Sequence, residues 1–92
     1  ARAMELLRRM IELGEKQPAL AFNIAMLLEK RGAPAADLAW LYGHAVEADA
    51  EFADAWLNLG NVLEALGERD RAVACWRKAM EQKPELARGY FG

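Results

Sequence analysis

The sequence predicts an all-α protein built from antiparallel helical hairpins. Alanine, leucine, glutamate, arginine and methionine, which favour helices, dominate the 92 residues, and β-branched residues are scarce. Apolar residues recur at helical spacing in segments that stop at glycine or before proline. The same apolar pattern returns after 34 or 35 residues, as expected for a chain that repeats a unit of two helices.

Glycine and proline define where the expected helices end. Gly32 and Gly67 each follow an apolar segment, and glycine closes a helix with little strain. Pro84 cannot continue the helix that precedes it. The expected helices are residues 2–13, 18–31, 36–48, 53–66 and 69–83, and residues 85–92 begin a sixth.

The internal repeat keeps one register along the chain. A shift of 34 residues places the third helix on the fifth, so that Tyr42 falls on Trp76. A shift of 35 residues places the second helix on the fourth, so that Asn23 falls on Asn58. The additional residue lies in the loop at 32–37, where an insertion costs little. With both shifts applied, the first helix falls on the fifth as well.

The spacing of the landmark residues in the second copy resembles the tetratricopeptide repeat. That pattern is W-x2-L-G-x2-Y, then A-x3-F, then P. Leu63 stands where the pattern has Tyr, and Trp76 stands where it has Phe. The residues that match the pattern are Trp56, Leu59, Gly60, Ala72, Ala79 and Pro84.

The resemblance implies a right-handed α-solenoid of antiparallel helix–turn–helix hairpins. The match is weaker in the first copy, where Ala21 and Leu38 depart from the pattern. Each hairpin of such an array has an apolar face that only a neighbouring repeat covers, so we expect self-association through the end helices. The chain is then one array fragment, with residues 1–17 as the second helix of a preceding repeat, 18–52 and 53–86 as repeats, and 87–92 as the start of another.

By the same resemblance, the first helices line a concave groove that binds a protein or an extended peptide. Asn23 and Asn58 occupy the same position in the two repeats, and an amide can both donate to a peptide carbonyl and accept from a peptide N–H. The pair is similar to the asparagine ladder of O-linked N-acetylglucosamine transferases. The alternative is that both amides are only solvated polar groups. The expected groove residues are Phe22, Asn23, Met26, Lys30, Asp54, Leu57, Asn58, Asn61 and Arg88.

Other residue roles follow from the same positions. Leu57 stands where the carboxylate-clamp subclass, which binds acidic chaperone tails, needs a lysine one turn before Asn61, so that subclass is not expected. Four apolar residues either receive hydrophobic ligand side chains or pack against adjacent helices, and these are Phe22, Met26, Leu57 and Phe91. Trp40 lies off the apolar stripe and is either exposed or covers a neighbour. These alternatives stay open.

Composition excludes several classes of function. The net charge of −2 lacks the basic footprint of a nucleic-acid binder, and no apolar segment approaches the ~20 residues of a membrane span. The sequence contains no nucleophile–base pair, phosphate loop or metal-ligand spacing, so catalytic residues, cofactors and metals are not expected. His44 aligns with Lys78 on the solvent side. Cys75 is expected to fill apolar space and suits a reducing compartment, which favours the cytoplasm.

The leading interpretation is a non-enzymatic module that binds protein or peptide in the groove, as the recruiting arm of a larger protein. Partners among nucleic acids and membranes are not expected. Two alternatives stay open. The chain could be a structural or self-association scaffold, or the repeat region of a glycosyltransferase whose catalytic domain lies elsewhere.

Overall fold

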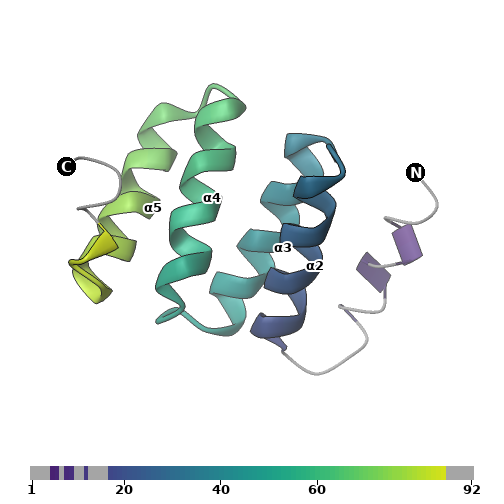
Figure 1. Cartoon of the computed structure of the whole chain (residues 1–92), viewed down its shortest axis with the longest axis horizontal. Helices are drawn as coiled ribbons and strands as arrows, with labels where there is room; N and C mark the ends of the chain where they lie inside the picture. The colour runs from purple at the N-terminus through teal and green to yellow at the C-terminus, as the bar shows by residue number, and fades with distance from the viewer. Residues whose placement is uncertain (1–4, 7, 10–11, 13–16, 87–92) are drawn as a thin grey trace.

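The computed structural model describes residues 5, 6, 8, 9, 12 and 17–86. The described part contains helices and no strands, and the four helices end within one residue of the predicted ranges, which confirms the all-α fold. The described residues of the predicted first helix are helical, whereas residues 87–92 lie outside the description. Labelled as in Figure 1, the helices are α2 (Pro18–Lys30), α3 (Ala35–Ala48), α4 (Ala53–Ala65) and α5 (Arg69–Gln82).

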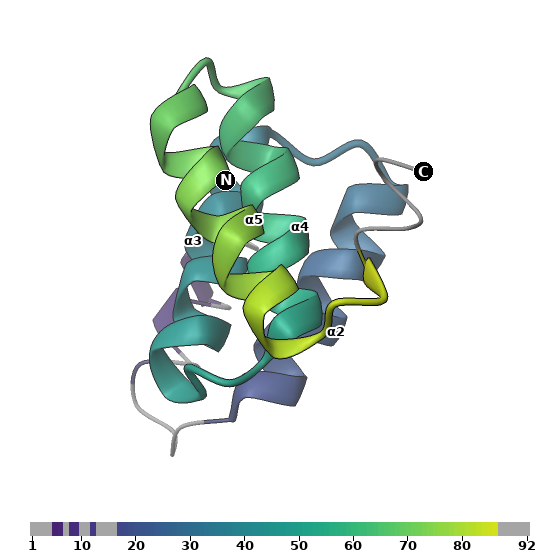
Figure 2. The ribbon, with the colours of Figure 1, turned by 90° about the vertical axis from the view of Figure 1, so that its left-hand side faces the viewer.

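The four helices form a row of two hairpins. Helix α2 packs against α3, α4 packs against α5, and contact between α3 and α4 joins the two hairpins. Figure 2 looks along this row, with α2 and α4 drawn toward the right and α3 toward the left. The first helices of the two hairpins therefore lie toward the same side of the molecule.

Both first helices end in the same glycine turn. Gly32 and Gly67 have φ angles of +78° and +83°, a region that glycine adopts without the strain of a Cβ atom. The N–H of Gly32 donates to the carbonyl of Glu29 at 3.0 Å, and the next N–H donates to the carbonyl of Leu28 at 3.0 Å. The same two bonds recur after Gly67 at 2.9 Å. These bonds satisfy carbonyls that the end of a helix leaves unpaired. Because Gly32 and Gly67 are 35 residues apart, the backbone repeats with the same shift as the sequence.

The second hairpin is closed by contact between Gly60 of α4 and Trp76 of α5. A Cβ atom at Gly60 would lie 2.5 Å from Cδ1 and Nε1 of the Trp76 indole and 3.1 Å from the carbonyl oxygen of Ala72. A Cβ atom essentially never lies within 3.0 Å of a non-bonded heavy atom. The absence of a side chain at Gly60 is therefore what allows the indole to lie against the α4 backbone.

The hydrophobic core continues from one hairpin into the next. Tyr42, Leu41 and Leu63 are the largest fully buried side chains, and burial of a side chain of this size contributes roughly 1.5–3 kcal/mol. Cys75 is 6% exposed, as predicted for an apolar filler. The core comprises Ala21, Ala25, Leu38, Leu41, Tyr42, Ala45, Val46, Ala55, Leu59, Val62, Leu63, Ala72 and Cys75.

The Gly60 contact predicts opposite effects of one substitution at two helical glycines. Gly60→Ala gains about 1 kcal/mol of helix propensity but forces the new methyl group against the indole, and overpacking of this kind costs about 1–3 kcal/mol. We expect Gly60→Ala to lower the free energy of unfolding, measured by urea denaturation.

Gly43→Ala is the matched control, because Gly43 lies within α3 and a Cβ atom there meets no described atom within 4 Å. It should raise the free energy of unfolding by up to about 1 kcal/mol. Combining Gly60→Ala with Trp76→Leu should cost less than the sum of the two single changes. Equal effects of the two glycine substitutions would contradict the close contact.

Candidate functional site

Most of the residues predicted to line the groove lie on the surface of α2 and α4, whereas Phe22 of α2 is half-buried against neighbouring helices. Together with Glu29, which lies beside them on α2, the following residues are called the first-helix surface. Asn23, Met26, Glu29 and Lys30 of α2 are exposed, and Asp54, Leu57, Asn58 and Asn61 of α4 are half-buried. Arg88, which was also predicted to line the groove, lies outside the described residues.

The hydroxyl of Tyr42 brings the two first helices together. Its side chain extends from α3 and is 0% exposed, and its hydroxyl donates a hydrogen bond of 2.7 Å to Oε1 of Glu29 on α2. The side chain of Asn58 on α4 interacts with the same hydroxyl and lowers its pKa slightly. Two residues of the first-helix surface, one from each hairpin, therefore lie next to the Tyr42 hydroxyl.

Burial raises the pKa of Tyr42 well above its ordinary value near 10. The hydrogen bond to Glu29 and the negative charge of that carboxylate raise the pKa further, because both favour the neutral phenol. The interaction with Asn58 acts in the opposite direction and is the smallest contribution. The hydroxyl consequently stays protonated near neutral pH and remains a donor to Glu29.

The second hairpin contains a related contact. Trp76 occupies the position in α5 that Tyr42 occupies in α3, and its Nε1 donates to Oδ1 of Asn61 at 3.1 Å. Thus the core aromatic residue of each second helix donates a hydrogen bond to a polar residue of its own first helix. Tryptophan and tyrosine suit this role because each has an apolar ring and a polar tip. The sequence aligned the two aromatic residues but did not reveal these bonds.

Phe22 packs against neighbouring helices, which was one of its two predicted roles. Its ring lies 5.8 Å from the Tyr42 ring in an edge-to-face arrangement of 62° and 4.8 Å from the Phe52 ring. Phe22 is half-buried, so its ring contributes to the junction between the hairpins. Met26, by contrast, is 39% exposed, and Leu57 is half-buried.

Trp40 of α3 covers a neighbour, which was one of its two predicted roles, and that neighbour is Arg8. The guanidinium of Arg8 lies 5.1 Å from the centroid of the Trp40 ring, and Arg8 also pairs with Asp37 at 3.4 Å. His44 stacks on Trp40 with centroids 5.5 Å apart. The prediction that His44 lies on the solvent side therefore needs correction, because this stacking leaves His44 half-buried.

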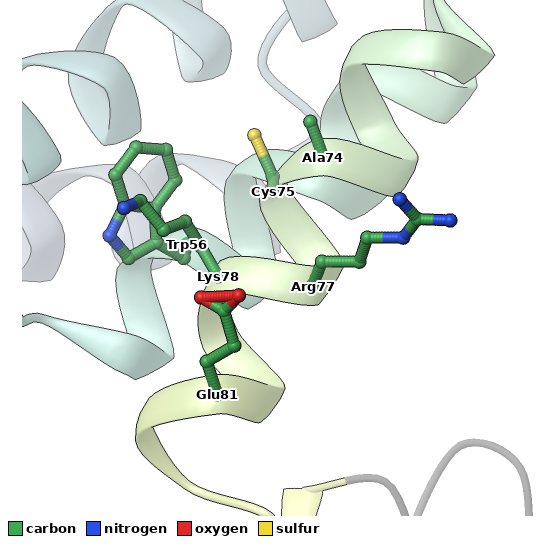
Figure 3. Close-up of a pocket in the computed structure, with 6 residues that line it drawn as sticks. All are labelled: Trp56, Ala74, Cys75, Arg77, Lys78 and Glu81. Atoms are coloured by element: carbon green, nitrogen blue, oxygen red, sulfur yellow. The ribbon is translucent and has the colours of Figure 1, made fainter.

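A shallow pocket of about 360 Å³ opens beside α5, away from the first-helix surface. Figure 3 shows the Trp56 ring on one side of this pocket and Arg77 directed away from it. Trp56 is fixed by a hydrogen bond of 2.8 Å from its Nε1 to the carbonyl oxygen of Ala50. Burial raises the pKa of the Cys75 thiol, which makes it a poor nucleophile. The pocket is lined by Trp56, Ala74, Cys75, Arg77, Lys78 and Glu81.

Two further observations on the described residues concern metal binding and membrane insertion. They contain no group of three or more histidine, cysteine, aspartate or glutamate side chains that could hold a metal ion. None of the helices in this part of the chain is long and apolar enough to cross a membrane.

Comparison with known proteins supports a repeat family for this chain. Residues 53–86 match the tetratricopeptide repeat family, and these are the boundaries predicted for the second repeat. Domains of this family are typically non-catalytic modules that mediate protein–protein interaction. No curated protein matches the chain.

The raised pKa of Tyr42 predicts a loss of stability at alkaline pH. Unfolded Tyr42 ionises near pH 10, whereas in the folded chain its pKa is higher. The unfolded state therefore loses its proton first, and the contribution of Tyr42 to stability is complete below pH 10 and declines as pH rises further. Tyr42→Phe should remove this part of the pH dependence. Urea denaturation between pH 8 and pH 11 checks this, and parallel curves for the two proteins would contradict it.

Proposed function

Taking as premise the tetratricopeptide repeat that residues 53–86 match, we propose that the chain binds an extended peptide segment on the first-helix surface. The binding is non-catalytic, and the chain acts as the recruiting part of a larger protein. The similarity to the repeats of O-linked N-acetylglucosamine transferases stays a prediction.

The convergence of Glu29 and Asn58 on the Tyr42 hydroxyl carries this proposal. It supports one continuous surface across both hairpins, because residues of α2 and α4 share a partner there. Asn23, six residues before Glu29 on α2, is exposed, so its amide is accessible to a peptide. A surface that spans two repeats suits an extended segment better than a small molecule.

The chemistry of the surface favours contact with a peptide backbone. An asparagine amide can donate to a peptide carbonyl and accept from a peptide N–H at the same time, so it binds main chain with little regard to sequence. The apolar side chains of Met26 and Leu57 lie on the same helices and offer contact area for ligand side chains. Methionine adapts its shape readily to different partners.

Substitution of the asparagines tests the proposed surface. The probe is a twelve-residue peptide selected from a random library for binding to the wild-type chain. Asn23→Ala and Asn58→Ala should each weaken binding by about 0.5–1.5 kcal/mol, the net value of a neutral hydrogen bond, measured by isothermal titration calorimetry. The stability of Asn23→Ala should stay close to that of the wild type, because its side chain is exposed.

Arg77→Ala and Lys78→Ala are the controls, because both residues are exposed and line the pocket beside α5. They should leave the affinity for the peptide unchanged. If the two control substitutions weaken binding and the asparagine substitutions do not, the pocket beside α5 is the binding site and the proposal fails.

Exposed leucines favour a second function, self-association. Leu6 is 63% exposed, Leu27 is 55% exposed and Leu20 is 43% exposed. Large apolar surfaces of this kind commonly mark contacts between proteins. Leu6 belongs to the predicted first end helix, whereas Leu20 and Leu27 belong to α2. Most of the first end helix and all of residues 87–92 lie outside the described residues.

We therefore expect the isolated chain to self-associate. Sedimentation velocity across a concentration series should give a sedimentation coefficient that rises with concentration. Leu27→Gln with Leu20→Gln should reduce this rise, because the two substitutions remove exposed apolar surface from one helix. A sedimentation coefficient that stays at the value of a monomer at high concentration would refute self-association. The proposed peptide surface would be unaffected.

A further inference from the structure

Glu29 stands in an unfavourable place for an acidic residue. It is the next-to-last residue of α2, where the carbonyl groups at the helix end carry a partial negative charge. A carboxylate at this end is repelled by the helix dipole, whereas a basic residue would be attracted. Residues that lower the stability of their own helix are concentrated at functional sites. The position of Glu29 therefore calls for a physical reason.

Tyr42 holds this carboxylate in one orientation. The bond between the Tyr42 hydroxyl and Oε1 of Glu29 is 2.7 Å long, and the donor belongs to a side chain that is 0% exposed and cannot move freely. Exposed glutamates normally lose rotamer entropy when they pair with a ligand, which weakens surface ion pairs. At Glu29 part of that loss has already occurred on folding.

Within the described part of the chain, no ion pair compensates the charge of Glu29. Lys30 is its neighbour in sequence, and adjacent residues on a helix do not face each other. Asp54, the other carboxylate of the first-helix surface, already pairs with Lys83 at 3.5 Å. Glu29 is exposed, so its negative charge is open to a ligand.

We propose that Tyr42 and Glu29 make the first-helix surface selective for peptides with a basic side chain, arginine or lysine. Glu29 contacts the cation, and Tyr42 is the positioning residue that fixes the carboxylate beside Asn58. This inference rests on the proposed function and adds the chemical class of its partner. Contacts between the asparagine amides and the peptide main chain provide affinity. The fixed negative charge of Glu29 provides the preference for peptides with a basic side chain.

Two small probes test the charge preference without a selected peptide. N-acetyl-arginine amide carries the cation, and N-acetyl-citrulline amide has nearly the same shape without the charge. Both are titrated into the full chain, and the affinity is followed by NMR chemical shifts of the α2 backbone. The wild-type chain should bind the arginine probe about fivefold more tightly than the citrulline probe, the upper range for an exposed ion pair.

The variants separate contact from positioning. Glu29→Gln should abolish the preference for arginine over citrulline. Tyr42→Phe, which keeps the ring and removes only the hydroxyl, should reduce the preference by about twofold while the affinity for citrulline stays unchanged. A role of Tyr42 in stability alone would lower both affinities equally, which would overturn its assignment as a positioning residue.

Glu81→Gln is the matched control, because it removes the same charge from an exposed position on α5. It should leave the preference intact. Loss of the preference in Glu81→Gln, or its persistence in Glu29→Gln, would overturn the inference. If selected peptides bind through Asn58 but the arginine and citrulline probes bind equally, this inference fails and the proposed function stands. If selected peptides bind elsewhere, the proposed function fails.

Discussion

The burial of Tyr42 between the two hairpins is the contact on which the candidate surface depends. Its side chain is fully buried, its ring packs against Phe22 in an edge-to-face arrangement, and its hydroxyl donates to Glu29. A buried hydroxyl must find a partner, because an unsatisfied one costs about 1–3 kcal/mol. The partners available are polar residues of the first helices. The packing of the core therefore determines which polar groups stand on the surface and how they are oriented.

In the second hairpin, a different pair of residues gives the polar group of a core aromatic side chain its hydrogen-bond partner. Trp76 is larger than Tyr42, and it fits because Gly60 leaves room for the indole. Its N–H then reaches Asn61 at 3.1 Å, whereas Tyr42 reaches Glu29. The two hairpins share a backbone arrangement, including the glycine turns that end the first helices. They differ in the polar group that each core aromatic residue holds, so the two repeats present different chemistry along one surface.

Periodicity and glycine positions were enough to predict the helices and their order, because both are local properties of the sequence. The contact between Gly60 and the Trp76 indole, by contrast, is seen only in the structure. The orientation of single side chains could not be predicted in this way. Phe22 turns toward Phe52, and His44 stacks on Trp40, because residues from other helices complete their surroundings. The bond between Tyr42 and Glu29 has the same origin, since sequence spacing does not encode contacts between helices.

The central claim is that the first-helix surface, and not the pocket beside α5, contacts a bound peptide. The most direct measurement follows the side-chain amide resonances of the ¹⁵N-labelled chain while the selected twelve-residue peptide is added. Gln82 provides an internal reference, because its amide donates to the carbonyl oxygen of Ala50 at 2.7 Å, close to Trp56. The account predicts that the resonances of Asn23 and Asn58 shift and that the resonance of Gln82 does not. A shift of Gln82 with unchanged asparagine resonances would contradict it.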